Sequence, residues 1–214
     1  MKICGIDEAG RGPVIGPMII TGAMIDEDKQ PVLKELGVKD SKLIAPKKRD
    51  RIAAELPKYV KYETIIVEPE EIDRYLEADN GTNLNWLEAD KSIIILNKLK
   101  PDVAYIDSPS PNLKAYTAYI KEKVPGVEIH CEHKADANYL PAGAASIIAK
   151  AKREEIIAEM KKQYGDIGSG YPADPKTKAY LQHNWNKHPE IFRQSWLSYK
   201  NVAKSRKQQK LGSF

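Results

Sequence analysis

Acidic residues at the ends of two short apolar runs are the side chains of this sequence best suited to chemistry. Asp7 and Glu8 follow the run at residues 3–6, and Asp107 ends the run at residues 103–107. Ligands of open α/β sheets gather at the carboxyl ends of strands. Neighbouring parallel strands lie about 4.8 Å apart, so two such carboxylates would stand side by side, which is costly without a proton or cation between them. The all-oxygen ligand set predicts a hard ion such as Mg²⁺ or Mn²⁺.

A third acid and several other reactive residue types leave alternatives open. Asp136 follows the apolar run at residues 127–131 and precedes a long helical pattern, where it would serve equally well as a metal ligand or as a helix cap. Asp7 and Glu8 could likewise form an ordinary exposed acidic pair. His130 and His133 lie three apart on a predicted strand and face opposite sides, so we assign them no ligand role. Cys4 and Cys131 fit neither a disulfide framework nor a zinc spacing and are predicted to be small buried hydrophobes.

Strand-like and helix-like segments alternate along the chain. Apolar, β-branched runs predict strands at residues 2–7, 18–25, 62–67, 103–107 and 127–131. Helical periodicity predicts helices at residues 46–60, 83–99, 113–123 and 143–164, with further packed helices beyond residue 171. This order predicts an α/β domain with a mixed, partly parallel sheet.

Composition and charge narrow the class of protein. The chain is 42% hydrophobic and 30% charged, which is typical of a soluble globular protein. Its longest apolar runs fall far short of the roughly 18 residues of a membrane span, and the amino terminus lacks a signal-peptide pattern, so we expect a cytoplasmic protein with no membrane partner. The net charge of +4 is concentrated late in the chain, where residues 200–214 carry several bases and no acid. This asymmetry is a weak indication of a nucleic-acid ligand.

Six motifs, in order, carry a resemblance to a known family. They are Asp7-Glu8-Ala9-Gly10-Arg11-Gly12, Asp40-Ser41-Lys42, Asp107, Lys134-Ala135-Asp136, the helical residues 144–150, and Gly168-Ser169-Gly170-Tyr171-Pro172. With these motifs the chain resembles the type 2 ribonucleases H, in particular archaeal ribonuclease HII, over about residues 3–196. The resemblance implies a ribonuclease H-like mixed sheet flanked by helices, with a helical carboxy-terminal region. We expect a catalytic domain at residues 1–165, a packed helical region at 166–204 and a flexible tail at 205–214.

The resemblance also implies an activity and its metal ligands. The protein would be an endonuclease that hydrolyses the RNA strand of RNA–DNA hybrids and cuts at ribonucleotides embedded in DNA. Asp7, Glu8, Asp107 and Asp136 would hold two Mg²⁺ or Mn²⁺ ions, one activating a water and the other stabilising the leaving 3′-oxygen. The products would carry 3′-hydroxyl and 5′-phosphate ends.

Further residues are assigned to the substrate by the same resemblance. Gly10, Arg11 and Gly12 would read the ribose 2′-hydroxyl, although the glycines also suit a plain turn. Tyr171 would contact the RNA-to-DNA junction, although an isolated tyrosine is commonly a packing residue. Lys42, Ser146 and Lys150 would contact phosphates; Ser146 and Lys150 share a helical face, and the lysines would otherwise be solvated.

The carboxy-terminal tail carries a separate pattern. Gln208, Leu211 and Phe214 have the spacing of peptides that dock on DNA sliding clamps, in which one helical turn presents apolar residues to a groove. The alternative is a basic tail that only attracts phosphate.

Two rival functions remain at this stage. One is a hybrid-binding module that has lost catalysis, which the presence of all four acids disfavours. The other is a DNA nuclease of the same superfold, such as a resolvase or transposase-like enzyme, which would have no use for a 2′-hydroxyl reader.

Overall fold

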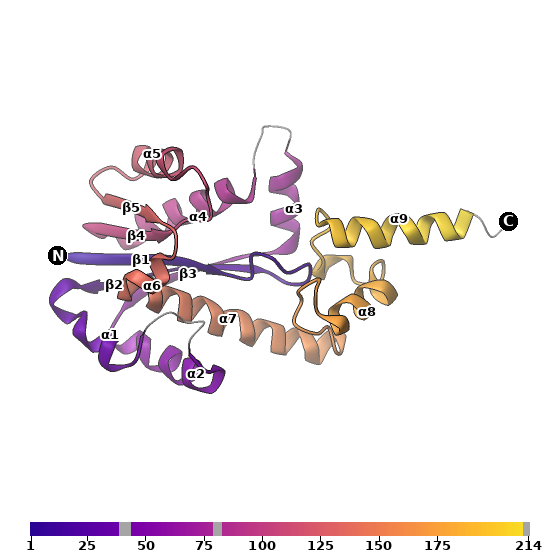
Figure 1. Cartoon of the computed structure of the whole chain (residues 1–214), viewed down its shortest axis with the longest axis horizontal. Coiled ribbons are helices and arrows are strands. Elements are labelled where there is room, and N and C mark those ends of the chain that lie inside the picture. Colours follow the sequence, from indigo (N-terminus) through magenta and orange to yellow (C-terminus); the bar gives the residue numbers. More distant parts are fainter. Residues whose placement is uncertain (39–43, 79–82, 212–214) are drawn as a thin grey trace. The chain divides into compact units, whose positions relative to one another are not determined.

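Five strands form one mixed sheet in a computed structural model that describes residues 1–38, 44–78 and 83–211, without the side chains of residues 206–211. The strand order is β3-β2-β1-β4-β5 (Figure 1). The strands are β1 (Lys2–Ala9), β2 (Met18–Asp26), β3 (Lys61–Val67), β4 (Val103–Asp107) and β5 (Glu128–Glu132). Strand β1 is antiparallel to β2 and parallel to β4, and β4 is parallel to β5. The predicted α/β fold with a partly parallel sheet is confirmed.

The chain divides into two compact units, which we describe separately. The first unit comprises Met1–Ala9, Ile19–Ile66 and Leu84–Lys152, and the second comprises Gly10–Met18, Val67–Asn83 and Arg153–Phe214. Helix α7 (Leu140–Tyr164) contributes residues to both. The three-part division expected from the sequence stays a prediction.

Helices cover both faces of the sheet in the first unit. Ile95 of α4 (Leu84–Leu99) packs so closely on Gly22 of β2 that a Cβ there would lie 2.4 Å from the isoleucine Cγ2. Gly22 pairs with Ile6, and consecutive residues of a strand face opposite sides, so Gly5 faces the other way. A Cβ on Gly5 would lie 1.9 Å from the backbone nitrogen of Ala142, at the start of α7. Helices α4 and α7 therefore pack on opposite faces of the sheet.

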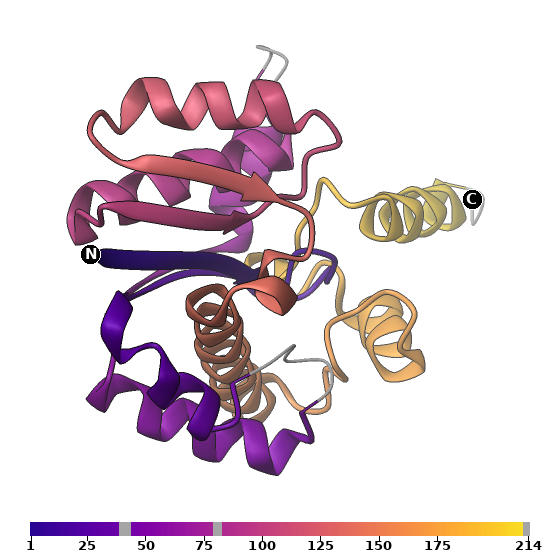
Figure 2. The same cartoon turned by 60° about the vertical axis from the view of Figure 1, so that its left-hand side comes forward.

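The helices on the α7 side form one apolar core. Helices α1 (Pro31–Glu35) and α2 (Pro46–Glu55) lie on this side of the sheet, opposite α5 (Leu113–Lys123) (Figure 2). Leu33, Ile52 and Leu56 are almost fully buried against small residues of α7 such as Ala144 and Ala145. The small alanines let the helices approach closely, and the removal of this apolar surface from water stabilises the layer.

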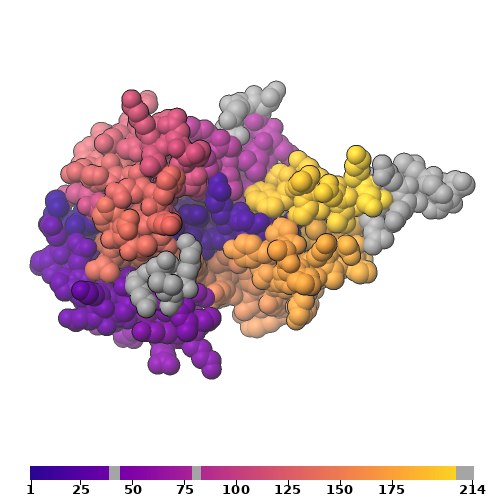
Figure 3. Space-filling model, viewed as in Figure 1, coloured from indigo at the N-terminus to yellow at the C-terminus, as the bar shows by residue number. Residues whose placement is uncertain are grey.

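The second unit has a core of its own. The helices of this unit are α3 (Pro69–Glu77), α8 (Pro175–Asn184), the short helix η4 (Pro189–Ile191) and α9 (Leu197–Leu211). Helices α8 and α9 lie side by side (Figure 3). Buried side chains from six segments form this core, among them Ile15, Ile157, Leu181 and Phe192.

Several boundaries differ from those predicted. Strand β1 runs two residues past Asp7, and α7 begins at Leu140 rather than at residue 143. Helix α2 ends at Glu55 and gives way to a 3₁₀ turn, η3 (Leu56–Lys58), because Pro57 cannot donate the next helical hydrogen bond. Helices α1, α3 and α6 (Ala135–Asn138) were not predicted from the sequence, nor was the 3₁₀ turn η1 (Glu27–Lys29). Helix α9 extends to Leu211, into the segment expected to be a flexible tail.

In the parts of the chain that the structure covers, no helix is long and apolar enough to span a bilayer.

Candidate active site

Strand pairing brings two of the predicted acids together. Ile6 of β1 is the register partner of Ile106 of β4, and Asp7 and Asp107 follow these residues on parallel neighbours. Their carboxylates leave the sheet at the same edge, as the apolar runs predict. Asp7 itself pairs with Thr21 of β2, so it lies within strand β1 and is held on the β2 side, one residue beyond the last pair of β1 with β4.

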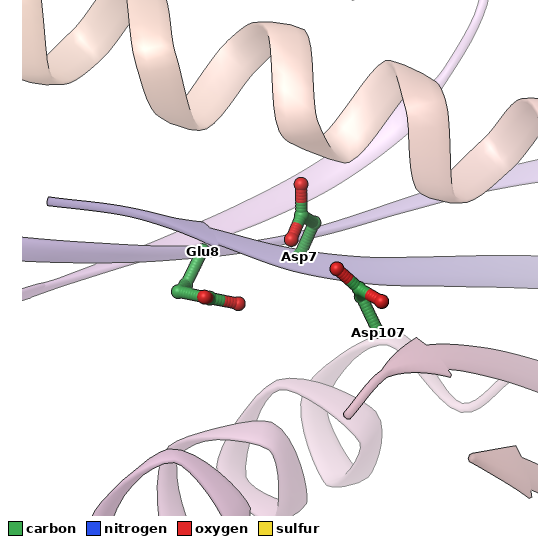
Figure 4. A group of neighbouring side chains, drawn as sticks. All are labelled: Asp7, Glu8 and Asp107. Atoms are coloured by element: carbon green, nitrogen blue, oxygen red, sulfur yellow. The ribbon is translucent and has the colours of Figure 1, made fainter. Parts of the chain in front are cut away.

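Three carboxylates form a compact group, the carboxylate cluster of Asp7, Glu8 and Asp107. One oxygen of each lies within 4.8 Å of the others. Asp7 and Glu8 leave β1 on opposite sides, as neighbours on a strand do, and Asp107 reaches toward them from the end of β4 (Figure 4). Asp7 is 4% exposed, whereas Glu8 and Asp107 are half-buried.

Helix α7 positions Asp7 through a matched spacing. Gly5 of β1 contacts the backbone of Ala142 of α7. From this contact, the two strand residues to Asp7 span about 6.8 Å, and the four helix residues to Ser146 span about 6 Å, which is nearly the same distance. Asp7 therefore faces Ser146, which is fully buried and hydrogen-bonds the carboxylate. Lys150, one turn further along α7, donates to the Ser146 hydroxyl at 3.0 Å. The two helix residues expected at phosphates thus contact each other, and one of them contacts Asp7.

The short helix α6 (Ala135–Asn138) positions the remaining acids. The backbone N–H of Ala135 donates to Asp107 Oδ1 at 3.0 Å. Asp136 follows at once and is 3% exposed, outside the three-carboxylate group. The long helix α7 begins at Leu140, four residues after Asp136, and the N-cap position of α6 belongs to Lys134, which has φ 61°. Asp136 therefore caps neither helix, and the helix-cap alternative is wrong.

Burial and like charge dominate the electrostatics of the cluster. Burial, followed by the charge of Glu8, raises the pKa of Asp7 well above 3.8, and Asp107 and Asp136 add to this rise in pKa. The hydrogen bond from Ser146 acts in the opposite direction. A cation among these oxygens would relieve the repulsion, so the donor set fits a hard divalent ion. The role of the four acids as metal ligands stays a prediction.

The second unit contains the glycine loop, residues Gly10–Gly12. Gly10 has φ +78°, and a Cβ there would lie 2.4 Å from Nε of Arg153, so its lack of a side chain is structurally required. Gly12 is exposed and has no such constraint: a Cβ on it would make ordinary contact, 3.5 Å, with the ring of Tyr171. Tyr171 is 43% exposed, so its ring and Gly12 share an open surface.

A buried arginine that the sequence analysis did not single out supports Tyr171. The Arg153 guanidinium lies 5.4 Å from the centre of the Tyr171 ring, and its Nη2 donates to the Ser169 carbonyl at 3.2 Å. Arg153 is 8% exposed. The sequence offered one signal for this residue. Arg153 lies seven residues, or two helical turns, after Ser146, so both residues share one face of α7.

The structure also tests the predictions for the cysteines and histidines, whereas some other predicted residues lie outside the described parts of the chain. Both cysteines are buried and free, as predicted. His130 lies on β5, but His133 follows the end of that strand, so the prediction that both lie on one strand is wrong. Lys42 and Phe214 lie outside the described residues, as do the side chains of Gln208 and Leu211.

The repulsion within the cluster predicts that Asp7→Asn stabilises the protein in the absence of divalent ions. A carboxyl group whose folded-state pKa is raised lowers stability as pH rises from its unfolded pKa through its folded pKa, and asparagine removes this loss. We expect the thermal midpoint in EDTA to rise by at least about 2 °C near neutral pH, roughly 1 kcal/mol for a chain of this size, and the difference to shrink below about pH 4.

Asp26→Asn is the matched control, because Lys29 lowers the pKa of the half-buried Asp26. This variant should show no gain near neutral pH. A midpoint for Asp7→Asn at or below that of the wild type throughout the pH range would contradict the electrostatic account.

Comparisons with known proteins agree on one family. The family model of ribonuclease HII matches residues 4–199. Ribonuclease HII of Thermococcus onnurineus is 44% identical, covering 94% of this chain and 90% of that protein. The crystal structure of ribonuclease H2 from Pyrococcus horikoshii matches with TM-score 0.88 and 39% identity, over 96% of this chain and 98% of that chain. Ribonuclease HII in the PCNA:RNase HII complex from Archaeoglobus fulgidus matches with TM-score 0.84 and 36% identity, over 92% and 95%. The chain therefore belongs to the ribonuclease HII family, endonucleases that hydrolyse the RNA of RNA–DNA hybrids.

Proposed function

We propose that this endonuclease cuts both long RNA–DNA hybrids and single ribonucleotides embedded in DNA, using two Mg²⁺ or Mn²⁺ ions. The observation that carries the proposal is the carboxylate cluster, in which three acids from neighbouring parallel strands lie within 4.8 Å. Products would carry 3′-hydroxyl and 5′-phosphate ends. A cytoplasmic location is part of the same proposal.

The acids of the first unit would hold the ions. When bound, the two ions would activate a water and stabilise the leaving oxygen of an in-line displacement. Ser146 fixes the orientation of Asp7, and the Ala135 N–H fixes that of Asp107, so neither carboxylate has to be ordered when substrate arrives. We assign Ser146 this positioning role, and Lys150, which donates to it, remains our proposed phosphate contact. Lys42 is a proposed phosphate contact on sequence grounds alone.

The glycine loop and Tyr171 would recognise the ribonucleotide. Backbone groups at Gly12 can approach a ligand closely because the residue is exposed and has no side chain. The half-exposed ring of Tyr171 next to it offers an apolar face to a sugar or base. The chain passes from Ala9, the last residue of β1, directly into this loop. Only a ribose offers the 2′-hydroxyl that would hydrogen-bond there.

A duplex with one ribonucleotide separates this proposal from its rivals. In Mg²⁺ or Mn²⁺ we expect cleavage at the ribonucleotide, with 3′-hydroxyl and 5′-phosphate ends, no cleavage of the matched all-DNA duplex, and no cleavage in EDTA. Asp107→Asn should lower turnover by at least about a hundredfold while binding survives, and Asp26→Asn should leave turnover unchanged. Equal cleavage of the all-DNA duplex would indicate a DNA nuclease, and tight binding without cleavage would indicate a binding module.

Gly12→Ala tests the glycine loop with little risk to folding. Its backbone and its 3.5 Å contact with Tyr171 both tolerate a methyl group, so the thermal midpoint should stay within a few degrees. Because the methyl group would occupy the open surface, we expect kcat/KM on the single-ribonucleotide duplex to fall by at least about tenfold.

Gly126→Ala is the control, since nothing lies within 4 Å of that glycine although its φ is +86°. It should lose some stability and no specific activity. Normal turnover by Gly12→Ala would mean that the loop is only a turn.

We also propose that the carboxy-terminal peptide binds a DNA sliding clamp. The similar ribonuclease HII from Archaeoglobus fulgidus forms a complex with PCNA. In this chain, α9 extends through Gln208 and Leu211, and two positions three apart on a helix share one face. Gln208, Leu211 and Phe214 would form the anchor.

Removal of residues 208–214 tests the clamp proposal. Cleavage of short duplexes should be unchanged, whereas clamp binding measured by calorimetry should be lost. Phe214→Ala should weaken that binding by at least about tenfold, as expected for an aromatic anchor, and the charge-reducing variant Lys204→Gln should change it little. If Phe214→Ala and the wild type bind the sliding clamp equally well, the clamp proposal is wrong and the tail only attracts phosphate through its charge.

A further inference from the structure

Arg193 is the largest side chain that is fully buried among the described residues. It lies in the second unit, between η4 and α9. A buried guanidinium is costly unless its donors are satisfied, so its contacts indicate what the fold gains from it. Burial, and then the nearby charge of Arg153, lowers the pKa of Arg193 to about 9, so the guanidinium remains charged at neutral pH.

All three kinds of donor on Arg193 point to backbone carbonyls of the loop that contains Gly10–Gly12. Nη2 donates to Gly10 O at 2.6 Å, Nη1 to Arg11 O at 2.9 Å and Nε to Gly16 O at 3.0 Å. The guanidinium also lies 4.9 Å from the centre of the Trp196 ring. The indole N–H of Trp196 donates to the next carbonyl, Gly12 O, at 3.1 Å. Two side chains thus hold the three consecutive carbonyls of the glycine loop.

This arrangement fixes the opposite edge of the loop. In a planar trans peptide the N–H points away from the C=O, and the described backbone contains no cis bond. The carbonyls of Gly10 and Arg11 point toward Arg193, so the N–H groups of Arg11 and Gly12 point away from it. The third peptide ends in Pro13, which has no N–H. The loop therefore directs two adjacent donors, from Arg11 and Gly12, away from the buried arginine.

The segment that carries the arginine is itself anchored. The Arg193 N–H donates to Val14 O at 2.9 Å. On the next two residues, the N–H groups of Gln194 and Ser195 donate to the buried carboxylate of Asp73, at 2.6 and 3.0 Å. Hydrogen bonds to Asp73 therefore fix the segment that carries Arg193 to helix α3. The segment is held in place before any ligand binds.

We propose that Arg193, assisted by Trp196, is a positioning residue for ribonucleotide recognition, because it aims the Arg11 and Gly12 N–H groups at the ribose. The proposal rests on the function proposed above for the glycine loop. A lysine at position 193 would keep the charge, but it lacks the planar fork that spans three carbonyls. The loop of such a variant would lose its fixed orientation while the core packing around it remained.

Equilibrium binding by fluorescence anisotropy in EDTA tests this role, because no cleavage interferes. Each protein is titrated into a duplex with one ribonucleotide and into the matched all-DNA duplex. The wild type should prefer the ribonucleotide duplex. Arg193→Lys should weaken that binding by at least about tenfold, and Trp196→Phe, which removes a single hydrogen bond, by about fivefold. Affinity for the all-DNA duplex should stay within about twofold in both variants, since phosphate contacts supply it.

Leu181→Ala is the control for lost stability, because Leu181 is 3% exposed in the core of the same unit and lies on helix α8, outside the segment from Arg193 to Trp196 that hydrogen-bonds the glycine loop. It should lower the thermal midpoint and leave the preference for the ribonucleotide unchanged. An unchanged preference in Arg193→Lys, or an equal loss of preference in Leu181→Ala, would overturn the positioning role. If Arg193→Lys does not fold, Trp196→Phe decides in the same way. Equal binding of both duplexes by the wild type would overturn the proposed function of the loop as well.

Discussion

Repulsion between carboxylates that the backbone holds together is the constraint on which the first unit depends. Parallel pairing of β1 with β4 places Asp7 and Asp107 side by side, and neither strand can move without breaking the sheet. Further contacts hold both carboxylates in these positions. The close contact of Gly5 with Ala142 brings Ser146 within hydrogen-bonding distance of Asp7, and α6 directs a backbone N–H at Asp107. An arrangement that is unfavourable alone and favourable with cations is what a preorganised metal site requires, and it supports the metal-binding role that we propose for these acids.

The sequence predicted the parts of this arrangement that follow from strand periodicity. Apolar runs that end in Asp7 and Asp107 indicated neighbouring parallel strands, and the pairing register confirms them. The sequence did not predict contacts that depend on how a helix crosses a sheet. The hydrogen bond between Ser146 and Asp7 depends on the close approach of the α7 backbone to Gly5, and composition does not encode that approach. Helices α1 and α3 were missed although each has a proline in its first turn, because each is short, with five and nine residues.

The glycine loop illustrates a second limit of sequence reasoning. Its glycines suggested a turn or a binding loop, and φ +78° at Gly10 together with the open surface at Gly12 shows that the two glycines differ in kind. The side chain that holds the loop comes from Arg193, 183 residues after Gly10. An arginine in a basic carboxy-terminal half is ordinarily solvated, so only the folded structure distinguishes it from its neighbours.

Direct measurement of metal binding tests the central claim. Electron paramagnetic resonance of free Mn²⁺, titrated into the protein without nucleic acid, reports how much ion is bound. The account predicts saturable binding by the wild type, binding at least about tenfold weaker in Asp107→Asn because a ligand charge is lost, and wild-type binding in Asp26→Asn, which retains the whole carboxylate cluster. Equal Mn²⁺ affinity in the wild type and Asp107→Asn would contradict the claim that strand pairing builds the metal site.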